Sequence, residues 1–192
     1  GARRNERYLP GVSLPACLTV TASLEEAVHA VDAVVIAVPS AGFDALVRAL
    51  APVLPTHAGV AWATKGLAAD SDELLHHVAG RGLPGRPLGA LSGPSFASEV
   101  AAGQPTAVTL ASDDAAFGRA LADAFHGGTF RAYTNDDLIG VEIGGAVKNV
   151  LAIGTGIADG LALGANTRAG LITRGLAEIA RLGEALGARS QT

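Results

Sequence analysis

Ala33-Val-Val-Ile-Ala-Val38 is the stretch of the sequence that decides the fold. A continuous apolar run without alternating polar residues is typical of a parallel strand that is buried on both faces of a sheet. Before it, Ser23-Leu-Glu-Glu26 predicts the start of a helix, with Ser23 as the N-cap and Glu26 completing a capping box. After it, apolar residues recur at helical spacing at Phe43, Leu46, Val47 and Leu50. The region is therefore predicted to form a strand between two helices.

The same alternation of strands and helices continues to about residue 135. Short apolar or β-branched runs predict further strands over 60–63, 88–91, 106–110 and 129–133, and amphipathic stretches predict helices over 71–78 and 114–125. Alternating strands and helices are typical of a doubly wound sheet with right-handed crossovers. We therefore expect an α/β fold of the Rossmann-like class with a mostly parallel sheet.

The pattern changes at Asn135-Asp-Asp137, a cluster of residues that favour helix N-caps. No strand signal follows it. Residues 138–163 predict one long glycine-interrupted helix or two consecutive ones, and residues 171–186 predict another. We place a domain boundary here, with a sheet domain over residues 1–135 and the start of an all-helical domain over residues 136–192. The sequence ends soon after the last predicted helix, so we expect the helical domain to be incomplete.

Composition excludes several classes of protein. The net charge of −4 gives no electrostatic footprint for nucleic acid. Charged residues or glycine interrupt the most apolar windows, so we expect no membrane span. A single cysteine, Cys17, excludes an internal disulfide and fits a reducing compartment, so we expect a cytoplasmic protein. The adjacent pair His76-His77 points to different faces of its predicted helix, so we expect no metal site there.

Lysine is rare in this chain and occurs in unusual places. Of the 14 basic residues only Lys65 and Lys148 are lysines. Lys65 closes the apolar run that begins at Gly59, and Lys148 follows a run of small and apolar residues that begins at Ile143. An ammonium is a compact charge whose pKa burial can lower, whereas a guanidinium is always charged. The placement of these two residues indicates a need for the ammonium group itself.

Three predicted strands end in small, polar or backbone-exposing residues. These ends are Pro39-Ser40, Thr64-Lys65-Gly66 and Ser92-Gly93-Pro94-Ser95. In open α/β sheets, ligands bind at the carboxyl ends of the strands, near a topological switch point. The three ends are therefore predicted to converge on a ligand site at one edge of the sheet.

The helix that carries Lys148 has two glycines one turn before the lysine. Helical side chains lean toward the N-terminus, so Lys148 covers the turn that contains Gly144 and Gly145. Two glycines inside a helix cost roughly 1–2 kcal/mol relative to alanine, which indicates a compensating requirement. One interpretation is space for a bound molecule above the lysine. The other is close helix packing, with Lys148 in a buried ion pair to Glu142 or Asp159.

Several motifs resemble a known family. Trp62-Ala-Thr-Lys-Gly-Leu67, Ser92-Gly-Pro-Ser-Phe-Ala97 and Gly140-Val-Glu-Ile-Gly-Gly-Ala-Val-Lys-Asn-Val150 resemble the NAD(P)-dependent glycerol-3-phosphate dehydrogenases of the soluble bacterial type. The resemblance covers essentially the whole chain in order. It implies a dinucleotide-binding domain over residues 1–135 and the start of a helical substrate domain over 136–192. Both domains are expected to be truncated, because the family's Gly-x-Gly-x-x-Gly loop has no counterpart before Tyr8 and its later substrate-phosphate residues would lie beyond Thr192.

The resemblance also implies roles for individual residues. Lys148 is implied as the proton donor and acceptor at the C2 oxygen of the substrate, and Lys65 as a contact to both substrate and nicotinamide cofactor. The further substrate contacts implied are Gly93, Ser95 and Asn149. The further contacts implied for NAD(H) or NADP(H) are Ala97 and Pro39.

The implied reaction interconverts dihydroxyacetone phosphate and sn-glycerol 3-phosphate and supplies glycerophospholipid synthesis. A homodimer is implied as well, with no metal and no partner other than the small-molecule substrate and cofactor. Two alternatives stay open. One is a non-catalytic fragment of such an enzyme, and the other is a related β-hydroxyacid-type dehydrogenase with another substrate. The run Gly-Gly-Ala-Val-Lys-Asn-Val150 argues against the second.

Overall fold

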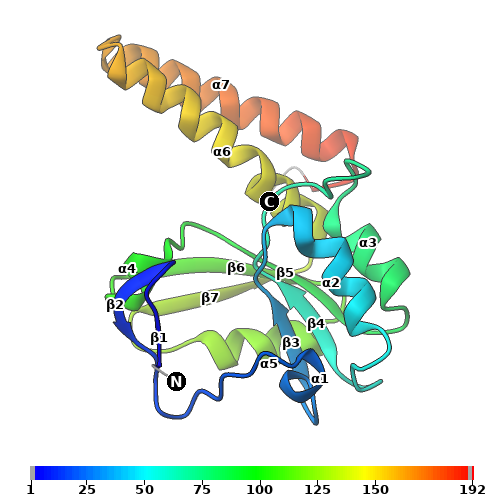
Figure 1. Ribbon diagram of the computed structural model, residues 1–192. Coiled ribbons are helices and arrows are strands. Elements are labelled where there is room, and N and C mark those ends of the chain that lie inside the picture. The colour runs from blue at the N-terminus through cyan, green and yellow to red at the C-terminus, as the bar shows by residue number, and fades with distance from the viewer. Residues whose placement is uncertain (1–2, 190–191) are drawn as a thin grey trace.

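A computed structural model describes residues 3–189 and 192 (Figure 1). Its main sheet has five strands in the order β3-β4-β5-β6-β7. The first three strands are parallel, β6 runs antiparallel to β5, and β7 is parallel to β6. The predicted mostly parallel, Rossmann-like sheet is confirmed. The strands are β3 (Ala33–Ile36), β4 (Gly59–Trp62), β5 (Leu88–Ser92), β6 (Thr106–Ser112) and β7 (Phe130–Asn135).

Helices cover both faces of this sheet (Figure 1). Helices α2 (Phe43–Leu50) and α3 (Leu75–Gly82) share one hydrophobic core, and α5 (Ala115–Phe125) packs in a second core. Successive strand residues point to opposite faces. Along β4, Val60 and Trp62 belong to the first core and Ala61 to the second. All four β4 residues are buried, which explains the continuous apolar run in the sequence.

The last two helices form a hairpin that projects from the sheet (Figure 1). They are α6 (Leu138–Gly160) and α7 (Gly164–Ala185). The first turns of α6 pack on β5 and β6, whereas the rest of the helix packs mainly on α7. A Cβ at Gly175 would lie 2.3 Å from Leu151 Cδ1, so glycine permits the close approach of the two helices there. Several apolar side chains of the hairpin are more than half exposed, namely Val150, Ile153, Ile157, Leu161, Leu163 and Leu176.

Helix α6 is long and apolar enough to cross a membrane, judged by length and composition alone. Its most apolar window has a mean hydropathy of 1.3. The helix also carries Glu142, Lys148 and Asp159, and its first turns pack on the sheet. The sequence predicts no stretch of this kind, and α6 is one by length and composition. Core helices of soluble proteins pass the same test.

The first strand of the sheet differs from its prediction. β3 pairs only with β4 and lies at the edge of the sheet, and Val35 is 37% exposed. Burial on both faces was therefore the wrong prediction for this strand. The helix before it, α1 (Leu24–Ala27), has the predicted N-cap, since Ser23 Oγ accepts from the Glu26 N–H at 3.2 Å. The capping box does not form, because the Glu26 carboxylate accepts from the Thr21 hydroxyl instead.

Some elements start elsewhere or were not predicted. Helix α3 begins at Leu75 rather than at residue 71, because Asp72 adopts a φ of 54° in the preceding turn. Helix α7 begins at Gly164 rather than at residue 171. The division into two domains near residue 136 stays a prediction. The elements that were not predicted are β1 (Arg4–Asn5), β2 (Leu9–Ser13), η1 (Ser40–Gly42) and α4 (Ala97–Ala101).

Candidate functional site

The two lysines converge on one backbone oxygen. Lys65 follows β4, and its Nζ donates to the carbonyl oxygen of Gly93 at 3.0 Å. Lys148 comes from α6, and its Nζ donates to the same oxygen at 3.3 Å. Gly93 directly follows the last residue of β5. Three segments that are distant in sequence thus bring two ammonium groups to one neutral acceptor.

The end of β3 lies beside the ends of β4 and β5. Thr64 Oγ1 donates to the carbonyl oxygen of Val38 at 2.7 Å, which ties the ends of β3 and β4 together. A Cβ at Gly66 would lie 3.6 Å from Ser40 Oγ. The predicted convergence of the three strand ends is therefore present in the structure.

Gly93 must be glycine for the carbonyl to take this position. Its φ of 149° lies in the region that side chains rarely adopt. An added Cβ would also lie 2.8 Å from the carbonyl oxygen of Ala107 and 3.0 Å from Val108 Cα. Both obstacles are backbone atoms of β6, which cannot move aside as a flexible side chain would.

Positive charge at the site has no carboxylate partner within residues 3–189 and 192. Burial lowers the pKa of Lys65, and the nearby Lys148 ammonium lowers it further. Glu142 is hydrogen-bonded to other groups, and Asp159 pairs with Arg168 at 2.7 Å. The alternative that Lys148 forms an ion pair with Glu142 or Asp159 is therefore wrong. Two cations that share a neutral acceptor favour an anionic ligand.

The two glycines before Lys148 serve different purposes. A Cβ at Gly145 would lie 2.6 Å from Ser92 Oγ, so this glycine lets α6 pack closely on β5. Gly144 has no other atom within 4 Å of its Cβ position and faces open space. Close packing is thus confirmed at Gly145, without the ion pair expected for Lys148, and the space beside Gly144 as a place for a bound molecule stays a prediction.

That open space is a pocket of about 450 Å³ between the helical hairpin and the sheet. A pocket of this size suits a small metabolite. Its lining includes Ser92, Gly93, Thr109, Gly144, Lys148 and Arg189. Arg189 pairs with Asp136 at 2.5 Å, which leaves Lys148 as the cation of the described lining that has no carboxylate partner.

The other residues singled out from the sequence lie at different distances from this center. Ser95 Oγ donates to the carbonyl oxygen of Gly93 at 3.4 Å and so belongs to the cluster. Ala97 is the exposed first residue of α4, and Pro39 is exposed just before η1. Asn149 is exposed on α6 and does not line the pocket. The structure therefore brings Lys65, Gly93, Ser95 and Lys148 together, but not Asn149.

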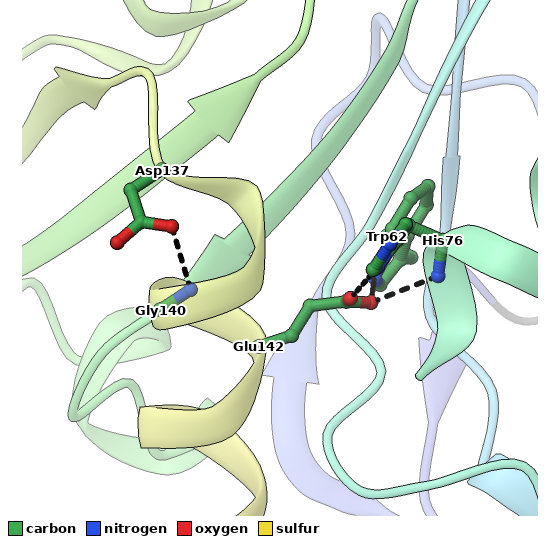
Figure 2. Close-up of polar contacts among 5 residues, drawn as sticks. All are labelled: Trp62, His76, Asp137, Gly140 and Glu142. Carbon is green, nitrogen blue, oxygen red and sulfur yellow. Dashed lines mark hydrogen bonds and ion pairs between the residues drawn. The ribbon is translucent and has the colours of Figure 1, made fainter. Parts of the chain in front are cut away.

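Sequence reasoning missed a buried network beside the lysines (Figure 2). Glu142 is 7% exposed, and one carboxylate oxygen accepts from Trp62 Nε1 at 3.0 Å and from the His76 N–H at 3.1 Å. Its other oxygen lies 2.5 Å from His76 Nδ1. A carboxylate in an otherwise apolar run, near the only tryptophan of the chain, was the available signal.

A second carboxylate fixes the start of α6. Asp137 caps the helix by accepting from the Gly140 N–H at 2.9 Å, as Figure 2 shows, and it also accepts from the Arg189 N–H at 2.8 Å. Burial would raise the pKa of Asp137, but hydrogen bonds from Thr192, Gly140 and Arg189 outweigh it, and the pKa is lowered. Asp137 therefore joins the first turn of α6 to the end of the described chain.

Comparisons with known proteins show which family the chain belongs to. Residues 1–125 match the model of the NAD-dependent glycerol-3-phosphate dehydrogenase N-terminus. The chain belongs to this dehydrogenase family. Residues 137–192 match the family's C-terminal model. The resemblance read from the motifs is confirmed.

Individual members of the glycerol-3-phosphate dehydrogenase family extend the match. The chain is 54% identical to glycerol-3-phosphate dehydrogenase [NAD(P)+] of Xanthomonas euvesicatoria over 98% of its own length and 55% of the relative's. A protein of the same name from Halorhodospira halophila is 54% identical, with 99% of this chain and 57% of the relative covered. The chain spans about half the length of the curated relatives it matches.

Solved structures of this dehydrogenase family show the same fold. The crystal structure of glycerol-3-phosphate dehydrogenase from Coxiella burnetii is 46% identical and matches with a TM-score of 0.93 over 99% of this chain and 58% of that one. The yeast glycerol-3-phosphate dehydrogenase structure is 31% identical, with a TM-score of 0.85 over 97% of this chain and 56% of that one.

Proposed function

We propose that the complete polypeptide that carries this sequence interconverts dihydroxyacetone phosphate and sn-glycerol 3-phosphate with NAD(H) or NADP(H), and so supplies glycerophospholipid synthesis. The observation that supports this most is the pair of ammonium groups on the Gly93 carbonyl beside the pocket. The curated relatives carry this activity in their names.

The two lysines suit a carbonyl reduction. Negative charge develops on the C2 oxygen as the carbonyl is reduced, and the Lys148 ammonium, which lies at the Gly93 carbonyl, would stabilise that charge and donate a proton to the oxygen. In the reverse direction the neutral amine of Lys148 would accept the proton. The Lys65 ammonium adds a second positive charge for a phosphorylated substrate.

The carboxyl ends of β3, β4 and β5 suit the nicotinamide end of a dinucleotide. Ligands of open α/β sheets bind along such an edge, and Pro39 and Ala97, which follow β3 and β5 in the chain, are exposed. The nicotinamide cofactor would supply or accept the hydride. We assign Pro39, Lys65 and Ala97 to the cofactor, and Lys65, Gly93 and Ser95 to the substrate. A substrate contact from Asn149, a homodimer and a cytoplasmic location rest on the family resemblance.

The test is Lys148→Met in the complete polypeptide. Loss of a general acid–base group is expected to lower kcat by about 10²-fold or more, while methionine preserves the helix because it is a good helix former. Steady-state turnover of dihydroxyacetone phosphate measures the change, and circular dichroism checks the fold. A variant that keeps most of its kcat would return Lys148 to a structural role.

The alternative of a non-catalytic fragment applies to the 192 residues taken alone. The chain covers 55% of the Xanthomonas relative. For this reason the kinetic test uses the complete polypeptide.

A further inference from the structure

Glu142 is a buried carboxylate that joins three elements. It lies on α6, and its side chain is 4% exposed. Its hydrogen bonds reach Trp62 on β4 and both the backbone and the ring of His76 on α3 (Figure 2). The ring contact joins His76 Nδ1 to the second carboxylate oxygen at 2.5 Å. Burial of a carboxylate is costly unless hydrogen bonds compensate it, and here both oxygens are satisfied.

Two members of the network lie close in sequence to the two lysines. Trp62 ends β4 three residues before Lys65, and Glu142 precedes Lys148 by six residues on α6. Six helical residues span about 9 Å, so the carboxylate and the ammonium leave α6 at different heights. Between them, Gly145 lies against Ser92. Helix α6 is thus fixed to the sheet side at three successive levels.

The hydrogen bonds of Glu142 restrict how α6 can slide or rotate on the sheet. Without an acceptor at position 142, the buried Trp62 Nε1–H and the partly buried His76 N–H would have no partner, and unpaired buried donors are costly. The helix would then shift to reach water or another acceptor. A shift by a fraction of a turn would move Lys148 away from Gly93.

We propose that Glu142 is a positioning residue that sets α6 on the sheet, through Trp62 and His76, and so holds the Lys148 ammonium at the Gly93 carbonyl. Glu142 does not line the large pocket beside Lys148. It does line a smaller pocket with Lys65, and the effect inferred here is the one on Lys148. The kinetic part of this inference rests on the proposed dehydrogenase function, whereas the structural part does not.

The kinetic test compares two substitutions in the complete polypeptide. Glu142→Met removes every acceptor and should lower kcat by about 10²-fold, since a misplacement of roughly 1 Å can cost that much, while the KM for the nicotinamide cofactor stays unchanged. Glu142→Gln keeps an oxygen for Trp62 and for the His76 N–H and should restore most of kcat. If Glu142→Met does not fold, His76→Leu takes its place as the test variant. This substitution removes only the imidazole ring from the network.

Leu83→Ala is the control for stability. Leu83 is buried in the same core but makes none of these hydrogen bonds. It should lower the thermal midpoint and leave kcat near that of the parent. If Glu142→Met lost no more kcat than Leu83→Ala, or if Glu142→Gln failed to recover it, the positioning role would be refuted.

A spectroscopic measurement separates this inference from the proposed function. In ¹⁵N NMR spectra of the parent, the Trp62 indole N–H is assigned through its loss in Trp62→Phe. Glu142→Met should shift this resonance and also the amide resonances of Gly93 and Gly145, whereas Glu142→Gln should leave the two glycines near their parent positions. Unmoved Gly93 and Gly145 resonances in a folded Glu142→Met would overturn the inference, whether or not the parent turns over dihydroxyacetone phosphate. A parent without turnover would overturn only the proposed function.

Discussion

The carbonyl oxygen of Gly93 is the single atom on which the candidate site depends, because two ammonium groups donate to it. Each lysine reaches it from a different element, so the carbonyl fixes the separation of the two charges. Its position in turn depends on a backbone conformation with a φ of 149° and on close contact with β6. Gly93, which has no side chain, therefore controls the relative positions of the Lys65 and Lys148 ammonium groups.

We expect Gly93→Ala to be more destabilising than an ordinary substitution at a positive φ. Strained backbone conformations cost of order 1–3 kcal/mol, and the contacts with Ala107 and Val108 add to that cost. Gly103→Ala is the matched control, because Gly103 has a φ of 74° and nothing within 4 Å of its Cβ position. Urea denaturation of both variants measures the free energy of unfolding. Equal losses would show that contact with β6 is unimportant.

The second residue-scale prediction concerns Lys65. Because its ammonium lies between the ends of β4 and β5, Lys65→Ala should raise KM for substrate and for cofactor and also lower kcat. Initial-rate kinetics with each ligand varied in turn would show this. A change in thermal stability with unaltered kinetics would exclude Lys65 from the site.

At the scale of elements, what could be predicted from the sequence depends on how local the signal was. Strand β4 was predicted because its apolar run is uninterrupted, and the convergence of Lys65 with Gly93 followed from the rule that strand ends share an edge. The hydrogen bond between Trp62 and Glu142 was not predicted, because it joins residues 80 positions apart and no periodic pattern marks it. The start of α3 was missed because a positive φ at Asp72 interrupts an otherwise helical pattern.

Helix α3 is also held by an exposed fork-shaped ion pair. Arg81 donates to both oxygens of Glu73, at 2.8 and 2.6 Å. Hydrogen bonds from Arg81, and then from Ser71, lower the pKa of Glu73 to about 2. A folded-state pKa below the ordinary 4.5 means that the pair stabilises the fold at higher pH and that this stabilisation disappears as pH falls from 4.5 through about 2.

Glu73→Gln should therefore lower the urea midpoint at neutral pH, and the gap to the parent should close as the solution is acidified through that range. Glu25→Gln is the control, because Glu25 is exposed and forms no ion pair within the described chain. A gap that persists below pH of about 2 would mean that the ion pair is not its cause.

At the scale of the whole molecule, the site proposed for the reacting end of a dinucleotide has no matching site for the pyrophosphate within the described chain. A Gly-x-Gly-x-x-Gly loop binds pyrophosphate when it follows a strand and opens a helix. One segment of the chain, Gly80-Arg-Gly-Leu-Pro-Gly85, matches this motif. It lies at the end of α3 and before β5, however, and opens no helix. The backbone N–H groups of a helix N-terminus are therefore not available there.

We expect the 192-residue chain on its own to bind NADH with a Kd no better than about millimolar, and to show no turnover with dihydroxyacetone phosphate. Titration of the chain into NADH while nicotinamide fluorescence is followed measures the affinity. Saturable micromolar binding would show that the cofactor is held by residues other than those assigned to it.

The scarcity of lysine gives the chain an unusual chemical selectivity. Both side-chain amines of the sequence donate to the Gly93 carbonyl, and the remaining side-chain cations apart from histidine are guanidinium groups, which acylating reagents and aldehydes attack far less readily. The lowered pKa of Lys65 increases the fraction of neutral, reactive amine at any given pH. Among side chains, labelling, surface immobilisation or aldehyde fixation through amines would therefore modify these two lysines. Reagents directed at carboxylates or at the exposed thiol of Cys17 would leave those two amines intact.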